Sequence, residues 1–255
     1  MQTQDKEDKI ILSRAEELMQ RCVDSNVITY TDFLDLRMQG IVNDAIKYSP
    51  CRHFSDGGYA DAERCRIVFL PDWASEENYA QDCPNEILRV CIKKGGRQLG
   101  HRDYLGAMLG LGISRAKTGD IIVRRDGADI IIDKSMEEFL LANFFKAGRT
   151  ELSLSVVPIS EINMSEIRTE TVTDTLASLR LDAFLASAYR TSRSRAQEAI
   201  SQGIVFLNHA ECRKSDAPIR DGDVVSVRGK GKCILEEIGK TSKKDRTFIT
   251  IKKFI

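Results

Sequence analysis

Leu179-Arg180-Leu181-Asp182, Thr191-Ser192-Arg193-Ser194-Arg195-Ala196 and Gly203-Ile204-Val205-Phe206-Leu207-Asn208 decide the fold of the C-terminal part of this 255-residue chain. Apolar residues recur at helical spacing after the first segment (Leu181, Phe184, Leu185, Ala188) and again after the second (Ala196, Ala199, Ile200). The Thr-Ser pair suits a helix N-cap, and Gly203 suits a left-handed helix C-terminus. This order predicts two short helices that share one small core, followed directly by a strand over residues 204–207.

The first turn of the predicted second helix is suited to binding phosphate. It holds Ser192, Arg193, Ser194 and Arg195, where unpaired backbone N–H groups and the positive end of the helix dipole favour an anion. The fold could place further positive charge on the same side, namely that of Arg180, Lys214, Arg228, Lys230 and Lys232. This constellation indicates RNA binding, whereas for any single arginine the alternative is an ordinary solvated helix surface.

An ordered set of residues over this segment strongly resembles the RNA-binding domain named after ribosomal small-subunit protein four, the S4 domain. The set comprises Arg180-Leu181-Asp182, Ser192-Arg193 with Ala196, Gly203 with Val205 and Asn208, Lys214, and Gly222-Asp223 with Val227. The resemblance implies two helices and a β turn that present an RNA face, with Arg193, Arg195, Asn208 and Lys214 as contacts. Gly222-Asp223 is expected to form the turn.

Charge is distributed unevenly along the chain. Residues 175–255 hold 16 Lys and Arg against 9 Asp and Glu, an excess of seven positive charges. The other residues hold 22 against 29, so the formal net charge is zero. Because phosphate binding depends on local positive potential, this neutral total does not argue against nucleic acid.

Neither a signal peptide nor a membrane span is expected, because the first residues are charged and no apolar run approaches about 18 residues. The cytoplasm is the expected location, and no membrane partner is predicted. The seven cysteines are odd in number and lack a C-x-x-C pair, which favours reduced thiols over a disulfide framework or a zinc site. Cys51 and His53 are close in sequence, but two possible ligands do not make a metal site. We expect no metal and no cofactor.

The acidic N-terminal half is predicted to begin with helices at residues 8–22 and 30–47, where apolar residues recur at helical spacing. Gly57-Gly58 favours a tight turn. Residues 67–70 are expected to form a buried strand that ends at Pro71.

From residue 86 the pattern is strand 87–93, helix 103–111, strands 120–124 and 129–133, helix 136–147 and strand 151–157. This βαββαβ order predicts a ferredoxin-like, RRM-like sheet with its helices on one face. The candidate third strand, 128–133, has no aromatic residue, so base stacking on this sheet is not expected. The predicted class is α+β. Its parts are a helical N-terminal region (1–80), the ferredoxin-like domain (81–160), a connector (161–177) and the S4-type domain with a basic tail (178–255).

A second resemblance covers nearly the whole chain. Its residues are Phe33-Leu34-Asp35, Gly57-Gly58-Tyr59 with Glu63-Arg64, Gly100-His101-Arg102-Asp103-Tyr104-Leu105-Gly106-Ala107, Leu111-Gly112-Ile113 with Arg115, and Gly119-Asp120-Ile121. Together with the C-terminal segment, these residues are similar to the YlmH family of bacterial RNA-binding proteins. The resemblance implies a cytoplasmic protein that binds structured ribosomal RNA, with members linked to the rescue of stalled large subunits. The large ribosomal subunit and tRNA are therefore the expected partners.

Enzymatic activity is not predicted, and no catalytic residue or small-molecule substrate is assigned. His101-Arg102-Asp103 matches the His-Arg-Asp triplet of a kinase catalytic loop. However, the other kinase motifs, namely the downstream Asn, the glycine-rich phosphate loop and the metal-binding Asp-Phe-Gly, are missing from the sequence. Asp103 is expected to cap a helix. The alternative function is an RNA-modifying enzyme such as a pseudouridine synthase, because such enzymes often carry the same kind of RNA-binding domain.

Overall fold

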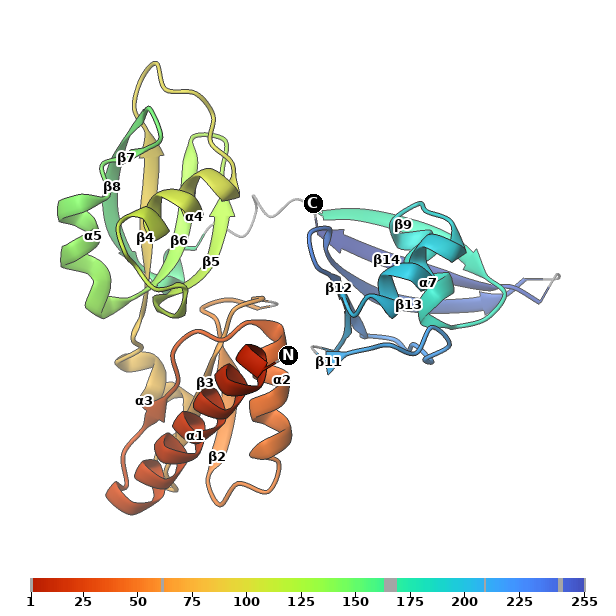
Figure 1. Cartoon of the computed structure of the whole chain (residues 1–255), viewed down its shortest axis with the longest axis horizontal. Coiled ribbons are helices and arrows are strands. Elements are labelled where there is room, and N and C mark those ends of the chain that lie inside the picture. Colours follow the sequence, from red (N-terminus) through yellow and green to blue (C-terminus); the bar gives the residue numbers. More distant parts are fainter. Residues whose placement is uncertain (1, 61, 163–168, 209, 243–244, 255) are drawn as a thin grey trace. The chain divides into compact units, whose positions relative to one another are not determined.

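The computed structural model describes residues 2–60, 62–162, 169–208, 210–242 and 245–254. The chain forms two compact units, an N-terminal unit (Met1–Glu166) and a C-terminal unit (Ile167–Ile255). Each unit combines helices with an antiparallel sheet (Figure 1). The predicted α+β class is confirmed.

The first part of the N-terminal unit is a three-stranded sheet packed against helices. Its elements are α1 (Gln2–Ser25), β1 (Thr29–Tyr30), α2 (Leu36–Ala45), β2 (Arg52–Asp56), β3 (Arg66–Leu70) and α3 (Glu76–Gln81). The strand order is β1-β3-β2, and both pairings are antiparallel. Leu18 of α1, Val42 of α2 and Phe69 of β3 share one buried cluster. The buried strand predicted at 67–70 is therefore confirmed as β3, the central strand.

The predicted helix at 30–47 is wrong in its first part. The backbone N–H groups of Thr31, Phe33 and Leu34 donate to the carbonyls of Ile67, Ala116 and Cys65 at 2.8–3.0 Å. These long-range bonds hold the segment extended. Helix α2 begins only after Asp35, whose side chain accepts from the backbone N–H of Met38. Helical periodicity in the sequence thus overestimated the helix by about half a dozen residues.

The second part of the N-terminal unit is the ferredoxin-like sheet. Its elements are β4 (Asn85–Ile92), α4 (His101–Gly110), the 3-10 turn η1 (Arg115–Lys117), β5 (Thr118–Val123), β6 (Gly127–Asp133), the 3-10 turn η2 (Lys134–Met136), α5 (Glu137–Asn143), β7 (Lys146–Ala147), β8 (Thr150–Pro158) and the 3-10 turn η3 (Ile159–Glu161). The strand order is β5-β6-β4-β8-β7. Helices α4 and α5 contribute Tyr104, Met108 and Leu140 to the same cluster as Val90 and Ile130 of the sheet. They therefore cover one face of the sheet, as predicted (Figure 1).

Helix α5 is shorter than the predicted helix at 136–147. It ends at Asn143, and the chain then forms a hairpin of β7 with β8. Gly148 lies in the hairpin turn with a φ of 59°, a conformation that favours glycine. The last residues of the predicted helix thus pair with a neighbouring strand.

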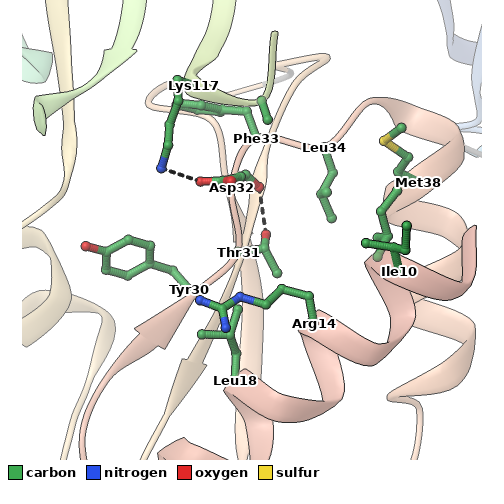
Figure 2. A pocket seen from close by; sticks show the side chains of 12 residues that line it. Ile10, Arg14, Leu18, Tyr30, Thr31, Asp32, Phe33, Leu34, Met38 and Lys117 are labelled. Atoms are coloured by element: carbon green, nitrogen blue, oxygen red, sulfur yellow. Dashed lines mark hydrogen bonds and ion pairs between the residues drawn. The ribbon is translucent and has the colours of Figure 1, made fainter. Parts of the chain in front are cut away.

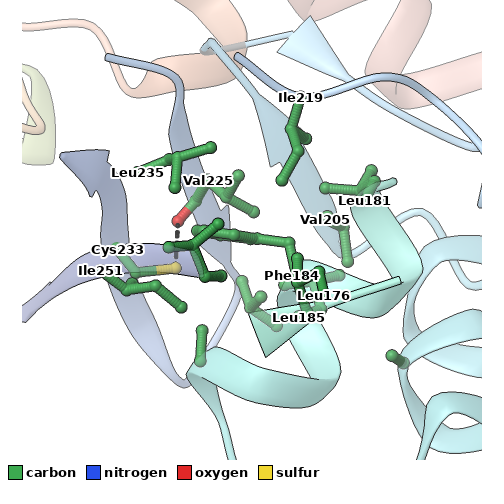
Figure 3. Packing of buried hydrophobic residues seen from close by; sticks show 14 of the residues in the cluster. Leu176, Leu181, Phe184, Leu185, Val205, Ile219, Val225, Cys233, Leu235 and Ile251 are labelled. Carbon is green, nitrogen blue, oxygen red and sulfur yellow. Dashed lines mark hydrogen bonds between the residues drawn. The ribbon is translucent and has the colours of Figure 1, made fainter. Parts of the chain in front are cut away.

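The C-terminal unit packs two helices on one face of a six-stranded sheet. Its elements are β9 (Thr169–Leu176), α6 (Leu181–Ala188), α7 (Arg193–Ser201), β10 (Val205–Leu207), β11 (Ala210–Glu211), β12 (Val224–Val227), β13 (Gly231–Thr241) and β14 (Thr247–Phe254). The strand order is β11-β10-β12-β13-β14-β9. Figure 3 shows Leu181 and Phe184 of α6 among Val205, Val225 and Ile251 of the sheet. The two predicted helices and the strand after them are confirmed.

Two segments for which no strand was predicted contain strands. Residues 169–176 of the expected connector form β9, which pairs with β14 from Leu176–Thr247 to Thr169–Phe254; residues 163–168 of that connector lie outside the described residues. The expected basic tail contains β13 and β14, which pair with each other in antiparallel fashion. Val172 and Leu176 of β9 pack against the buried cluster. Burial of these alternate side chains explains the strand, although its paired residues lie 71 to 85 positions later in the sequence.

Candidate nucleic-acid interface

The start of helix α7 has the geometry expected of a capped helix N-terminus. Ser192 is extended, with φ −71° and ψ 150°, and its side chain accepts from the backbone N–H of Arg195 at 3.2 Å. The side chains of Arg193, Ser194 and Arg195 are exposed in this first turn. The predicted cap is confirmed, and positive charge surrounds the helix end that attracts anions.

Arg193 is held in place by a buried carboxylate, Asp182. The Arg193 guanidinium donates from Nε and Nη2 to the two Asp182 oxygens, each at 3.1 Å. Gln197 donates to the same carboxylate at 2.8 Å, and Arg180 lies at 3.4 Å. Burial raises the pKa of Asp182, but the hydrogen bonds from Arg193 and Gln197 outweigh burial and lower it. The carboxylate is therefore ionised at neutral pH and fixes two of the predicted arginines.

The segment that carries Lys214 lies against the start of helix α6. The backbone N–H groups of Leu181 and Asp182 donate to the carbonyls of Ala217 and Ser215 at 2.9 and 3.0 Å. Arg180 forms an isolated β-bridge with Pro218. These contacts place the exposed residue Lys214 near the arginines that surround Asp182.

Asn208 has a structural role. Its amide donates to Asp223 at 2.8 Å, and its side-chain oxygen accepts from the backbone N–H of Val224 at 2.9 Å. The residue has a φ of 49°, and Gly222 has a φ of 81°. Gly222 and Asp223 thus lie in the predicted turn, and the Asn208 side chain ties that turn to the end of β10.

Arg228 and Lys230 lie in the turn between β12 and β13, apart from the Asp182 cluster. The Arg228 guanidinium is 5.8 Å from the centre of the Phe206 ring. The Lys230 ammonium is 6.0 Å from the centre of the Tyr189 ring, and the Tyr189 hydroxyl donates to the carbonyl of Gly231 at 2.9 Å. The structure thus gathers Arg180, Arg193 and the Lys214 segment, and it groups Arg228 and Lys230 with aromatic rings.

In the N-terminal unit, residues of the second sequence resemblance converge on Asp120. Its carboxylate accepts from the Tyr59 hydroxyl at 2.7 Å and from the backbone N–H groups of Glu63 and Arg64 at 2.7 and 3.1 Å. The Arg64 side chain donates to the carbonyls of Phe33, Arg115 and Thr118, each at 2.9 Å. These bonds join the three-stranded sheet to the ferredoxin-like sheet, so these motif residues have a structural role.

His101 begins helix α4, whose N-cap is Gly100. Asp103 is the third residue of the helix and contributes to capping, because its carboxylate accepts from the backbone N–H of Gly100 at 2.8 Å. Burial and the nearby Arg115 lower the pKa of His101. Burial and Arg64 lower the pKa of Arg115 to about 10. His101 is therefore a mainly neutral side chain at pH 7, close to the cationic Arg115 and Arg102.

A cavity of about 340 Å³ opens between helix α1 and the segment after β1 (Figure 2). The Lys117 ammonium and the Asp32 carboxylate form an ion pair at 2.7 Å on its wall. The lining residues are Ile10, Ile11, Arg14, Leu18, Tyr30, Thr31, Asp32, Phe33, Leu34, Met38, Ala116 and Lys117. The cavity is mostly apolar and lies in a different unit from the α7 site.

Within the described residues, no group of three or more His, Cys, Asp and Glu side chains is arranged to hold a metal ion. No helix in the same part of the chain is long and apolar enough to cross a membrane.

The sequence alone did not assign a role to Asp182, which orients Arg193, or to Gln197, which donates to the same carboxylate. Asp182 was visible only as the third letter of Arg180-Leu181-Asp182, and nothing local identifies its partners 11 and 15 residues downstream. The sequence did contain one signal: Asp182 is an acidic residue at a position of the first predicted helix that faces the core.

A capped, arginine-rich helix start on a small helix-and-sheet unit defines an S4-type RNA-binding protein, and residues 179–225 match the family model of the S4 domain. Residues 81–161 match a second family model, described as "Putative RNA-binding domain in YlmH". The chain is also 30% identical over 248 residues to the Ribosome-associated protein quality control protein P2 of Bacillus subtilis (strain 168). That alignment covers 97% of this chain and 96% of the relative. The chain belongs to the YlmH family, which confirms the second resemblance.

A solved structure, that of the cell division protein ylmH from Streptococcus pneumoniae, has a similar fold. The TM-score is 0.51 at 24% sequence identity, and the match covers 62% of this chain and 95% of that chain. This likeness supports the fold assignment.

Proposed function

We propose that this protein is a noncatalytic RNA-binding factor of the cytoplasm that binds ribosomal RNA on the large subunit and acts in ribosome rescue or quality control. The observation that carries the proposal is the near full-length similarity to a ribosome-associated quality control protein. The S4 and YlmH matches, which cover separate parts of the chain, support RNA as the ligand.

The RNA contacts proposed for the C-terminal unit lie around the start of α7. Ser192, Ser194 and Arg195 would bind phosphate through the helix end and its first turn. Arg193 uses Nε and Nη2 on Asp182, which leaves Nη1 to donate to RNA. Arg180 and Lys214 would extend this surface. Asn208 would contribute by holding the turn, because its side-chain atoms already bond to Asp223 and Val224.

The N-terminal unit is proposed to contact peptidyl-tRNA or a neighbouring ribosomal protein. Two modest contacts on one chain raise the effective concentration of each other, so selectivity does not require a very tight single site. The unit boundary also affects how fragments should be designed. Because β9 pairs with β14 along its length, a C-terminal fragment should begin at residue 167 and not at residue 175.

The test is co-sedimentation at matched salt with three targets: empty large subunits, large subunits loaded with peptidyl-tRNA, and intact ribosomes. We expect the strongest binding to loaded large subunits and the weakest to intact ribosomes. Equal binding to all three would refute the rescue role and leave general RNA binding in place.

The rival function is RNA modification. The triplet Arg180-Leu181-Asp182 is similar to the catalytic Asp segment of pseudouridine synthases, so Asp182 would be the catalytic residue of such an enzyme. In this structure the Asp182 carboxylate is buried and already accepts from Arg180, Arg193 and Gln197, which supports a structural role. Nucleoside mass analysis of RNA before and after incubation with the protein tests this directly. A new modified nucleoside would favour the enzyme.

A further inference from the structure

Strand β14 and the residue before it carry basic and aromatic side chains at alternate positions of one face. Ile249 and Ile251 point into the core beneath helix α6. Because successive side chains of a strand point to opposite faces, the even-numbered positions face away from the helices. Together with Arg246, just before the strand, they form the β14 stripe: Arg246, Phe248, Thr250, Lys252 and Phe254.

Contacts on the outer face hold the stripe in place. Arg246 donates from Nε to the Thr175 hydroxyl of β9 at 3.0 Å, and Thr175 pairs directly with Phe248. At the other end, the ammonium groups of Lys232 and Lys252 lie 4.3 and 5.6 Å from the centre of the Phe254 ring. Cations therefore flank the aromatic residues at both ends.

The Phe248 ring is open to a ligand. Its residue is 53% exposed, which is unusual for phenylalanine, although Ile249 and Ile251 beside it are buried. Gly239 on β13 lies next to Phe248 and has no side chain that could cover the ring. A Cβ at this glycine would lie 3.3 Å from the Phe248 Cβ. The Thr171 and Thr173 positions of β9 are also exposed. Glu237, opposite Thr250, is the acidic residue that pairs directly with the stripe.

We propose that the β14 stripe is a second RNA-binding site, which takes unpaired nucleotides by stacking a base on Phe248 and by neutralising phosphates with Arg246 and Lys252. Cations on both sides of an exposed aromatic ring suit single strands, because every base has a face that stacks and every linkage carries a negative charge. Arg246 and Lys252 are six residues apart, roughly 20 Å along the strand, so the stripe accommodates several nucleotides.

This site lies outside residues 179–225, which match the S4 model, and on the face of the sheet opposite helices α6 and α7. The proposal rests on the proposed RNA-binding function. It adds a different ligand. The α7 site offers a helix end and arginines that bind the phosphates of structured RNA, whereas the stripe offers an exposed aromatic ring on which an unpaired base can stack.

The test uses the full chain and two fluorescent RNAs, an oligouridine of about 12 nucleotides and a blunt hairpin without unpaired overhangs. Phe248→Ala should weaken oligouridine binding roughly 5- to 150-fold, the range typical of losing one stacked base, and should change hairpin binding less than about twofold. Lys252→Gln should lower the salt slope for oligouridine by about 0.7.

Matched controls separate the stripe from general effects. Phe145→Ala removes a phenylalanine of similar exposure, 59%, from the N-terminal unit. Lys253→Gln removes the neighbouring charge, whose side chain lies on the helix side of the sheet, 5.3 Å from the centre of the Tyr189 ring. Both variants should bind oligouridine like the wild type.

Unchanged oligouridine binding by folded Phe248→Ala and Lys252→Gln would overturn the stripe as an RNA site, and a protein-docking face would give that same result. If the wild type bound the hairpin in that experiment, the proposed RNA-binding function would stand. A wild type that bound neither RNA would refute both proposals.

Discussion

Replacing Asp182 with asparagine should destabilise the C-terminal unit and weaken its binding to structured RNA, although the change raises the net charge by one. The buried carboxylate accepts two hydrogen bonds from Arg193 at 3.1 Å and one from Gln197 at 2.8 Å. An asparagine has one acceptor oxygen in place of two, and its amide nitrogen faces donors. At least one charged donor therefore loses its partner.

The size of the effect follows from exposure. A hydrogen bond to a charged group contributes about 1.5–3 kcal/mol, and breaking a fully buried ion pair costs about 3–5 kcal/mol. The Arg193 side chain is 51% exposed, so water can solvate its freed donors. The Arg180 contacts, at 3.4 and 3.5 Å, are weak. We therefore expect a loss of about 2–3 kcal/mol in the free energy of unfolding at pH 7.

The loss should depend on pH. Because the pKa of Asp182 is lowered in the folded protein, its stabilisation is complete above the unfolded pKa of about 3.9 and disappears as the pH falls through the folded value. The difference between wild type and Asp182→Asn should thus be constant from neutral pH down to about 4.5 and shrink below about 4.

Hydrogen exchange measured by mass spectrometry gives the assay an internal reference. Peptides from α7 and β10 should exchange faster in Asp182→Asn, whereas peptides from β6 in the N-terminal unit should not change. Hairpin RNA affinity should fall, because Arg193 loses its fixed orientation. If α7 in Asp182→Asn exchanged as slowly as in the wild type, the stabilising role of Asp182 would be refuted. Tighter hairpin binding by the variant would show that the added charge outweighs the loss of Arg193 orientation.

Three further predictions concern charge and the junction within the N-terminal unit. Replacing both Arg195 and Lys214 with glutamate should reduce the slope of log affinity against log salt for hairpin RNA by about two. An unchanged slope in the folded variant would show that neither residue contacts the RNA. Asp120→Asn should lower the free energy of unfolding by about 1–3 kcal/mol and speed hydrogen exchange at residues 57–66, whereas peptides from β14, the control, should stay protected. If residues 57–66 exchanged equally fast in the variant and the wild type, Asp120 would not stabilise the junction between the two sheets. Burial raises the pKa of Asp133, but hydrogen bonds from Ser135 and the fully buried Arg66 lower it to about 2. The stabilisation that Asp133 contributes should therefore persist above about pH 4 and be lost between about pH 4 and pH 2. An NMR titration that gave the Asp133 carboxyl a pKa near 4 would contradict this.

Local signals in the sequence determined much of both units. The Thr191-Ser192 pair before a helical pattern predicted the α7 cap, and Gly203 predicted the left-handed end of that helix, where φ is 70°. The alternation from β4 to β8 predicted the ferredoxin-like order. These features depend on backbone groups a few residues apart, so the residue types along the chain reveal them.

Only the tertiary structure decided which residues act together. Strand β9 was unrecognised because it pairs with β14, whose residues lie 71 to 85 positions later. The partners of Asp120 lie 56 to 61 residues away, and Asp182 meets Arg193 only when α6 and α7 pack. The outward face of β14 is defined only once Ile249 and Ile251 are buried. Long-range pairing and burial select one register among many that local propensity allows, and so they decide which side chains form a surface.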